Sequence, residues 1–267
     1  MRKRIMFLLS LMIVSLVTFS SATYAWFSKQ YNPQVDNLSV GIRTQEHMMI
    51  SKSGLAGTFK DNIAFNELVG NSVVLEPVTG EVKESSIAIY DGNELASENG
   101  KYIKFSLYFS GSNDMDVYLE GSQSGTVIDI VPIENSIFTE EQINKMVDSL
   151  RIGFLSYSTR EIPTSSGTEI SYEPFETNVY SVNAKTPDNY KDVDVGTMPY
   201  KTFNNIGHTS GILDDVVLLS VAANKVSKLD VYIWLESKDV NCDEGIFNIA
   251  LKINLRFLAV KVEEADA

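Results

Sequence analysis

The sequence predicts an all-β protein, a jelly-roll-like antiparallel β-sandwich with one amphipathic helix and a long loop excursion. From residue 36 onward, apolar and polar residues alternate with a period of two in many short segments, as strands that bury one face do. Turn residues separate these segments, as in Asp91-Gly92-Asn93. No strand–helix–strand alternation is present, so we expect two packed antiparallel sheets.

Two segments carry the strand pattern most clearly. One has its apolar positions at Ile103, Phe105, Leu107 and Phe109. The other is the last in the chain, where one face collects Phe247, Ile249, Leu251, Ile253, Leu255 and Phe257. A strand of that length belongs in the middle of a sheet. Shorter strands are expected at 38–42, 87–90, 117–119, 127–131, 152–157, 216–221 and 229–235.

One segment has the spacing of a helix instead. Its apolar positions share one helical face: Ile143, Met146, Val147 and Leu150. Thr139, followed three residues later by Gln142, is the signature of a capping box at a helix start. We therefore expect one amphipathic helix that lies on a sheet.

Residues 159–210 depart from the strand pattern. They contain prolines at 163, 174, 187 and 199 and few sustained apolar alternations, so loops and short strands that project from the core are expected. This excursion also carries the aromatic residues that a ligand would contact: Tyr172, Phe175, Tyr180, Tyr190, Tyr200 and Phe203.

The N-terminus has the layout of an export signal. Basic residues at positions 2–4 precede an almost unbroken apolar run over residues 5–19, and Thr23 and Ala25 are small residues suited to a signal peptidase. We expect residues 1–25 to be the signal peptide, cleaved between Ala25 and Trp26, and residues 26–267 to form a single secreted domain. A retained membrane anchor is the alternative, because the run is only slightly shorter than the ~20 residues that span a bilayer.

Charge and cysteine content limit the partners. The formal net charge of −13 becomes about −16 once the three basic residues of the signal are removed, which repels nucleic acid and anionic lipid. We therefore expect the protein to contact the membrane only transiently, through its signal segment. Cys242 is the only cysteine, so no intrachain disulfide can form and stability must come from a packed core.

The sequence predicts no enzyme. His47 and His208 are the only histidines, and neither belongs to a His-Glu-x-x-His pattern. Acidic neighbours at 239, 243 and 244 would raise the pKa of the Cys242 thiol and disfavour a nucleophile there. No catalytic residue and no cofactor is therefore expected.

Calcium stays open as a ligand of two acidic clusters. One cluster is Asp239, Asp243 and Glu244, before the last strand, and the other is Asp188, Asp192 and Asp194, in the excursion. Neither has the spacing of an EF-hand, and solvated loop charges are the plainer interpretation.

The predicted cleavage site resembles that of a known family. Ala22-Thr23-Tyr24-Ala25-Trp26-Phe27-Ser28 is similar to the junction of the TasA and camelysin group of Firmicutes, which a SipW-type signal peptidase processes. Segments 105–109, 149–154, 231–236 and 249–257 are similar to exported proteins with this junction. The resemblance implies a jelly-roll-like domain, export, and assembly into biofilm-matrix fibres. The protease activity described for some relatives is not implied, because no zinc motif is present.

The expected mature N-terminus suggests a mode of assembly. Trp26 and Phe27 form an aromatic start, and Leu38, Val40 and Ile42 follow on a short alternating strand. Such a strand can pair with the open edge of another copy, or of a related exported subunit. The alternative is that the strand packs inside its own domain.

Two functions follow from these patterns. The first is a secreted structural protein of the cell surface or biofilm matrix, self-assembling into fibres by N-terminal strand exchange. The second is an extracellular carbohydrate- or cell-wall-binding β-sandwich module, whose ligand would meet the aromatic residues of the excursion.

Overall fold

The structure of the chain is a computed structural model. It describes residues 34–44, 48–69, 73–120, 127–131, 138–164, 167–185, 187–191, 200, 202–204, 216–243, 246 and 250–262. The predicted signal peptide and cleavage site at Ala25 and Trp26 lie outside these residues, as do Phe27, His47 and His208.

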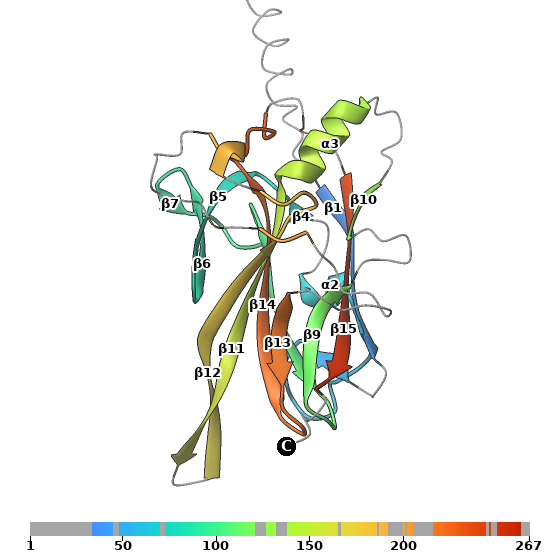
Figure 1. Cartoon of the computed structure of the whole chain (residues 1–267), viewed down its shortest axis with the longest axis vertical. Helices are drawn as coiled ribbons and strands as arrows, with labels where there is room; N and C mark the ends of the chain where they lie inside the picture. Colours follow the sequence, from blue (N-terminus) through green and yellow to red (C-terminus); the bar gives the residue numbers. More distant parts are fainter. Residues whose placement is uncertain are drawn as a thin grey trace, which may run out of the picture. The chain divides into compact units, whose positions relative to one another are not determined.

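Two β-sheets pack face to face, which confirms the predicted all-β sandwich (Figure 1). The first sheet has the order β13-β9-β15-β1-β3, with β10 on β15 and β4 on β1. Its strands are β1 (Gln34–Thr44), β3 (Asn62–Ala64), β4 (Val73–Val74), β9 (Met115–Glu120), β10 (Ile128–Val131), β13 (Val217–Val221) and β15 (Ala250–Lys261).

The second sheet has the order β12-β11-β14-β5-β6-β7, and β8 pairs with both β14 and β2. Its strands are β2 (Met49–Ser51), β5 (Pro77–Lys83), β6 (Ser86–Asp91), β7 (Glu94–Leu95), β8 (Ile103–Ser110), β11 (Leu150–Thr164), β12 (Gly167–Tyr180) and β14 (Val226–Glu236). Each strand expected from the sequence coincides with one of these elements, while β2, β3, β4, β5, β7 and β12 were not expected.

The main core lies between the two sheets. The predicted alternation of β8 is confirmed, since Ile103, Phe105, Leu107 and Phe109 are buried and the residues between them are half-buried. The ring of Phe257 on β15 meets Phe109 at 5.2 Å and Phe154 at 6.3 Å between centroids, both edge to face. These aromatic contacts join the two sheets through one residue of the central strand.

The predicted helix is confirmed as α3 (Glu140–Ser149), which Figure 1 shows at one end of the sandwich. Thr139 and Gln142 form the expected capping box, in which the Gln142 N–H donates to Thr139 Oγ1 and the Thr139 N–H donates to Gln142 Oε1. Met146 and Leu150 are buried on the apolar face. A four-residue helix, α2 (Phe65–Leu68), and a 3₁₀ turn over Pro187–Asn189 are also present.

The first part of the excursion over residues 159–210 differs from the loops and short strands that the sequence predicted. Residues 159–180 are mostly strand rather than loop, because β11 and β12 form a long hairpin that extends past its neighbours in the sheet (Figure 1). Beyond Ser156, β11 no longer pairs with β14, so most residues of the ribbon are exposed and the apolar alternation is lost. The edge position of β12 tolerates Pro174.

A second apolar cluster lies on the outer face of the second sheet. It packs the β5–β6 hairpin onto β11 and β14 through Val78, Ile87, Ile89, Leu155, Val179, Tyr232 and Trp234. Trp234 fits there because Gly80 and Gly153 leave room. A Cβ on Gly80 would lie 2.7 Å from Trp234 Cζ2, and one on Gly153 would lie 2.9 Å from Trp234 Cζ3.

Candidate functional site

The predicted assembly strand lies in the sheet of its own chain. β1 pairs in parallel with β15 from Gln34↔Ala250 to Thr44↔Ala259, with one register shift after Val35. On its other edge, the pairings among the described residues are short and antiparallel, with β3 over residues 39–41 and with β4 over residues 34–35. The sequence left open whether this strand pairs with another copy or packs inside its own domain. In the structure it packs inside its own domain.

The β1–β15 seam is closed on its core side. Val35, Leu38 and Val40 are at most 4% exposed, Ile42 is half-buried, and the facing residues of β15 are completely buried. At about 25 cal/mol per Å² of buried apolar surface, such a strand contributes several kcal/mol to folding. β1 is therefore a structural part of the sandwich.

A buried ion cluster joins the start of β11 to the loop after β14. The guanidinium of Arg151 donates from Nη2 to Asp239 Oδ2, and Lys185 Nζ lies 3.5 Å from the same oxygen. Arg151 Nη1 also donates to the Asp148 carbonyl at 2.6 Å. Because Arg151 and Asp239 are completely buried, the pair orders this end of the sheet only while both charges are present.

A second buried carboxylate, Glu236, organises the neighbouring aromatic residues. Its Oε2 accepts from Tyr200 Oη at 2.6 Å, from Trp234 Nε1 at 3.0 Å and from the Gly80 N–H at 3.1 Å. Burial, and then the adjacent Glu236 charge, hold the pKa of Tyr200 well above its ordinary value, so its hydroxyl stays protonated and donates. This network fixes Tyr200 against the β5–β6 hairpin.

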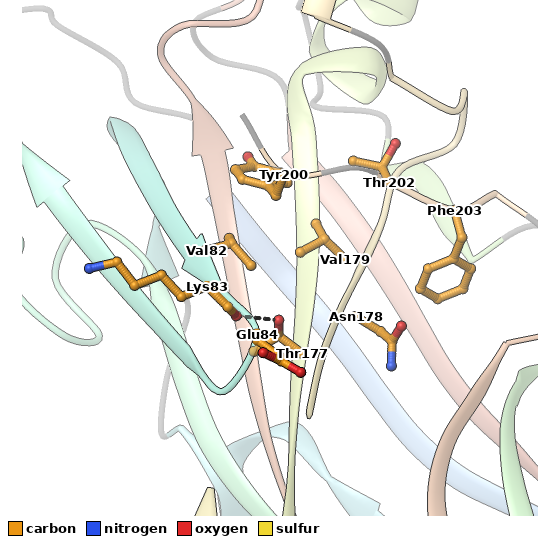
Figure 2. A pocket seen from close by; sticks show the side chains of 9 residues that line it. All are labelled: Val82, Lys83, Glu84, Thr177, Asn178, Val179, Tyr200, Thr202 and Phe203. Atoms are coloured by element: carbon orange, nitrogen blue, oxygen red, sulfur yellow. Dashed lines mark hydrogen bonds between the residues drawn. The ribbon is translucent and has the colours of Figure 1, made fainter. Parts of the chain in front are cut away.

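Beside Tyr200 a cavity of about 370 Å³ opens at the edge of β12 (Figure 2). Three segments form it: the β5–β6 turn with Val82, Lys83 and Glu84, the end of β12 with Thr177, Asn178 and Val179, and the later residues Tyr200, Thr202 and Phe203. Figure 2 shows Val82 and Val179 facing each other below Tyr200, and the Lys83 ammonium pointing away from the other labelled side chains.

The aromatic residues predicted to contact a ligand differ in their burial and in their distance from the cavity. Tyr180 and Tyr190 are buried, and Tyr172 is half-buried against Tyr108 with ring centroids 5.7 Å apart. Phe175 is 62% exposed at the bulge of β12, where no β11 residue faces it. The structure brings only Tyr200 and Phe203 together at the cavity.

Those members of the two acidic clusters that the structure describes are not grouped as calcium ligands would be. Asp239 is neutralised by Arg151 and Lys185, and Asp243 pairs with Lys145 at 3.0 Å, so both carboxylates face protein cations. Asp188 is exposed, while Asp192, Asp194 and Glu244 lie outside the described residues. Over the part of the chain that is described, no three His, Cys, Asp or Glu side chains gather as metal ligands would.

Cys242 is a buried thiol. Burial first, and then the Asp239, Glu236 and Asp243 charges, raise its pKa to about 12 although Lys191 opposes them. The expected direction is therefore correct, but desolvation contributes more to the raised pKa than the acidic neighbours do. A neutral, covered thiol is a poor nucleophile.

No protein-family model matches the chain, and no curated protein matches it either. From β1 to β15, the described helices include none with the length and apolar character needed to cross a membrane.

Sequence reasoning missed the ion cluster and most of the cavity. Arg151 stands in an apolar segment and pairs with a residue 88 positions away, so its partner could not be identified from spacing. Glu84 and Asn178 look like ordinary turn and strand residues. The usable signal was Arg151 itself, since a charged residue in a strand that is otherwise buried requires a buried counter-charge.

Proposed function

We propose that this chain is a secreted structural protein of the cell surface or biofilm matrix, which self-assembles by exchanging its N-terminal strand between copies. The observation that carries the proposal is the β1–β15 seam. β1 is the first described element, and its longest described pairing is with β15, the last described strand. A terminal element of this kind can be supplied by a second copy with all its contacts kept, which makes exchange a low-cost route to assembly.

The geometry of exchange favours open chains over closed pairs. If β1 of each copy enters the sheet of the next, the contact is head to tail, and such contacts generate filaments unless the rotation closes a ring. The partner is then a second copy or a related exported subunit, with a SipW-type signal peptidase acting during export. The proposal assigns no catalytic role, because the buried carboxylates Asp239 and Glu236 are engaged by structural donors.

Electron microscopy combined with size-exclusion chromatography tests this function. The chain that starts at Trp26 is examined with and without calcium, at neutral and at mildly acidic pH. The proposal expects fibres or discrete oligomers whose amount increases with protein concentration. A monomer under every condition would count against a self-assembling matrix subunit.

A further inference from the structure

The cavity at the edge of β12 is built from segments that are held in place. Thr177 Oγ1 donates to the Lys83 carbonyl at 2.6 Å, which ties β12 to the β5–β6 turn (Figure 2). The Phe203 N–H donates to the Val179 carbonyl at 2.9 Å, and the Ser181 N–H donates to the Phe203 carbonyl at 3.0 Å. The walls are therefore fixed by backbone and side-chain hydrogen bonds. Binding of a ligand would lose little conformational entropy in these segments, because they are already ordered.

Two polar side chains at this cavity are uncommitted. Within the described part of the chain, neither Glu84 nor Asn178 makes a side-chain hydrogen bond or ion pair, whereas Lys83 is paired with Glu81 at 2.6 Å. Glu84 is exposed and Asn178 is half-buried. The carboxylate accepts hydrogen bonds and the amide both donates and accepts them, so together they match a ligand rich in hydroxyl groups.

The rest of the lining mixes apolar and polar side chains, since Lys83, Thr177 and Thr202 belong to it beside the valines and the aromatic residues. Val82 and Val179 face each other across the cavity, and Tyr200 and Phe203 add aromatic surface. The volume of about 370 Å³ falls in the range of small-ligand sites. A sugar presents both kinds of surface, because its C–H groups pack on apolar walls while its hydroxyls bond to amide and carboxylate oxygens.

We propose that this cavity binds a neutral saccharide unit, with Glu84 and Asn178 holding its hydroxyl groups. Neutral sugars are favoured because the chain carries a formal net charge of −13, and Glu173 and Glu176 add exposed carboxylates on β12. The site goes beyond a purely structural role, since it would attach the protein to a glycan of the wall or matrix. It does not depend on strand exchange.

Binding to defined oligosaccharides tests the site. The monomeric fraction of the chain from Trp26 is titrated in a calorimeter with neutral oligomers of glucose and of N-acetylglucosamine, and with an anionic oligogalacturonate as the opposite case. We expect saturable binding of at least one neutral oligomer and none of the anionic one. Binding of cationic peptides in place of sugars, or no binding of any neutral oligomer, would overturn the proposal.

Three variants locate the binding. Asn178→Ala and Glu84→Gln should each weaken affinity about tenfold or more, since hydrogen bonds to a charged or buried partner are worth that much. Glu94→Gln, at an exposed glutamate of β7 that is absent from the lining, is the matched control and should bind like the unchanged chain. Circular dichroism checks that all three fold. Affinity retained in both cavity variants would contradict the site, whether or not the protein forms fibres.

Discussion

At the scale of single residues, the buried pair Arg151–Asp239 makes the sharpest prediction. Asp239→Asn keeps the shape of the side chain but leaves Arg151 and Lys185 without their shared counter-charge. We expect the free energy of unfolding to fall by about 3–5 kcal/mol, as happens when one partner of a buried ion pair is removed. Urea titration followed by circular dichroism measures this change.

The control is an exposed ion pair on the hairpin. Glu173 lies 3.3 Å from Arg160, and both side chains are more than half exposed. Glu173→Gln should cost less than about 1 kcal/mol, because solvent screens such pairs. A cost of Asp239→Asn no larger than this control would show that the buried cluster does not order the sheet.

Titration of buried groups predicts a loss of stability in alkali. Burial raises the pKa of Cys242 from 9.0 to about 12 and that of Tyr180 from 10.0 to about 12. Both groups keep their protons in the folded state after the unfolded chain has lost them. Their contribution is therefore complete below about pH 9 and is lost as the pH rises toward 12, by on the order of 1.4 kcal/mol per pH unit and group.

Urea midpoints measured between pH 8 and pH 11 check this dependence. The variant Cys242→Ala removes the thiol, so its midpoint should fall less steeply than that of the unchanged chain. Equal slopes for the two proteins would mean that the thiol titrates normally in the folded state.

At the scale of elements, the packing of the β5–β6 hairpin depends on two glycines. A Cβ on Gly153 would lie 2.8 Å from Ile87 Cδ1 and 2.9 Å from Trp234 Cζ3, so Gly153→Ala must push the hairpin outward. We expect a loss of about 1–3 kcal/mol, the usual cost of overpacking. Gly41→Ala on β1 is the control, because its nearest neighbour is the Asp61 carbonyl oxygen at 4.0 Å. Equal stability of the two variants would contradict this packing.

The strands and the helix that bury one face could be predicted from the sequence. Strands without a buried face could not. β8 and the described part of β15 carry alternating apolar residues because one face of each lies in the core. α3 showed both its apolar face and its capping box. By contrast, β12 is solvated along much of its length, and its residues Glu169, Glu173 and Glu176 look like a loop. Short pairings such as β7 have too few residues for any period to emerge.

The candidate site was harder to predict than the fold, because it is assembled from distant segments. The aromatic residues Tyr200 and Phe203 were identified, yet the polar residues Glu84 and Asn178 beside them come from a distant turn and a distant strand. The sequence left Asp239 as a solvated loop charge or a calcium ligand, because its acidic neighbours are visible there while its partners Arg151 and Lys185 are not. Pairings over such separations depend on the strand order, which local patterns do not contain.

At the scale of the whole molecule, β1 holds the first sheet together. Val35, Leu38 and Val40 are buried against β15, so deletion of residues 26–42 would expose the central strand as well as remove the assembly segment. We expect the deleted chain to lose its cooperative thermal transition in circular dichroism. A chain that still melts cooperatively would show that β1 is dispensable for the fold, contrary to the packing described here. Deletion alone therefore cannot separate folding from assembly.

A covalent trap separates them, because it keeps β1 in place. Gly41 lies opposite Arg256 in the parallel register of β1 and β15, and there is room for a Cβ at Gly41. Gly41→Cys with Arg256→Cys, in a Cys242→Ala background, allows a disulfide across the seam. A control pair, Arg160→Cys with Ser171→Cys, lies across the β11–β12 hairpin and links only within one copy.

The most direct measurement is a non-reducing gel of the assembled, oxidised double-cysteine protein. Strand exchange predicts a ladder of covalently linked copies for the β1–β15 pair and a single monomer band for the hairpin pair. If the assembled protein gives only monomer for both pairs, each β1 lies in its own sheet, and assembly by strand exchange is contradicted.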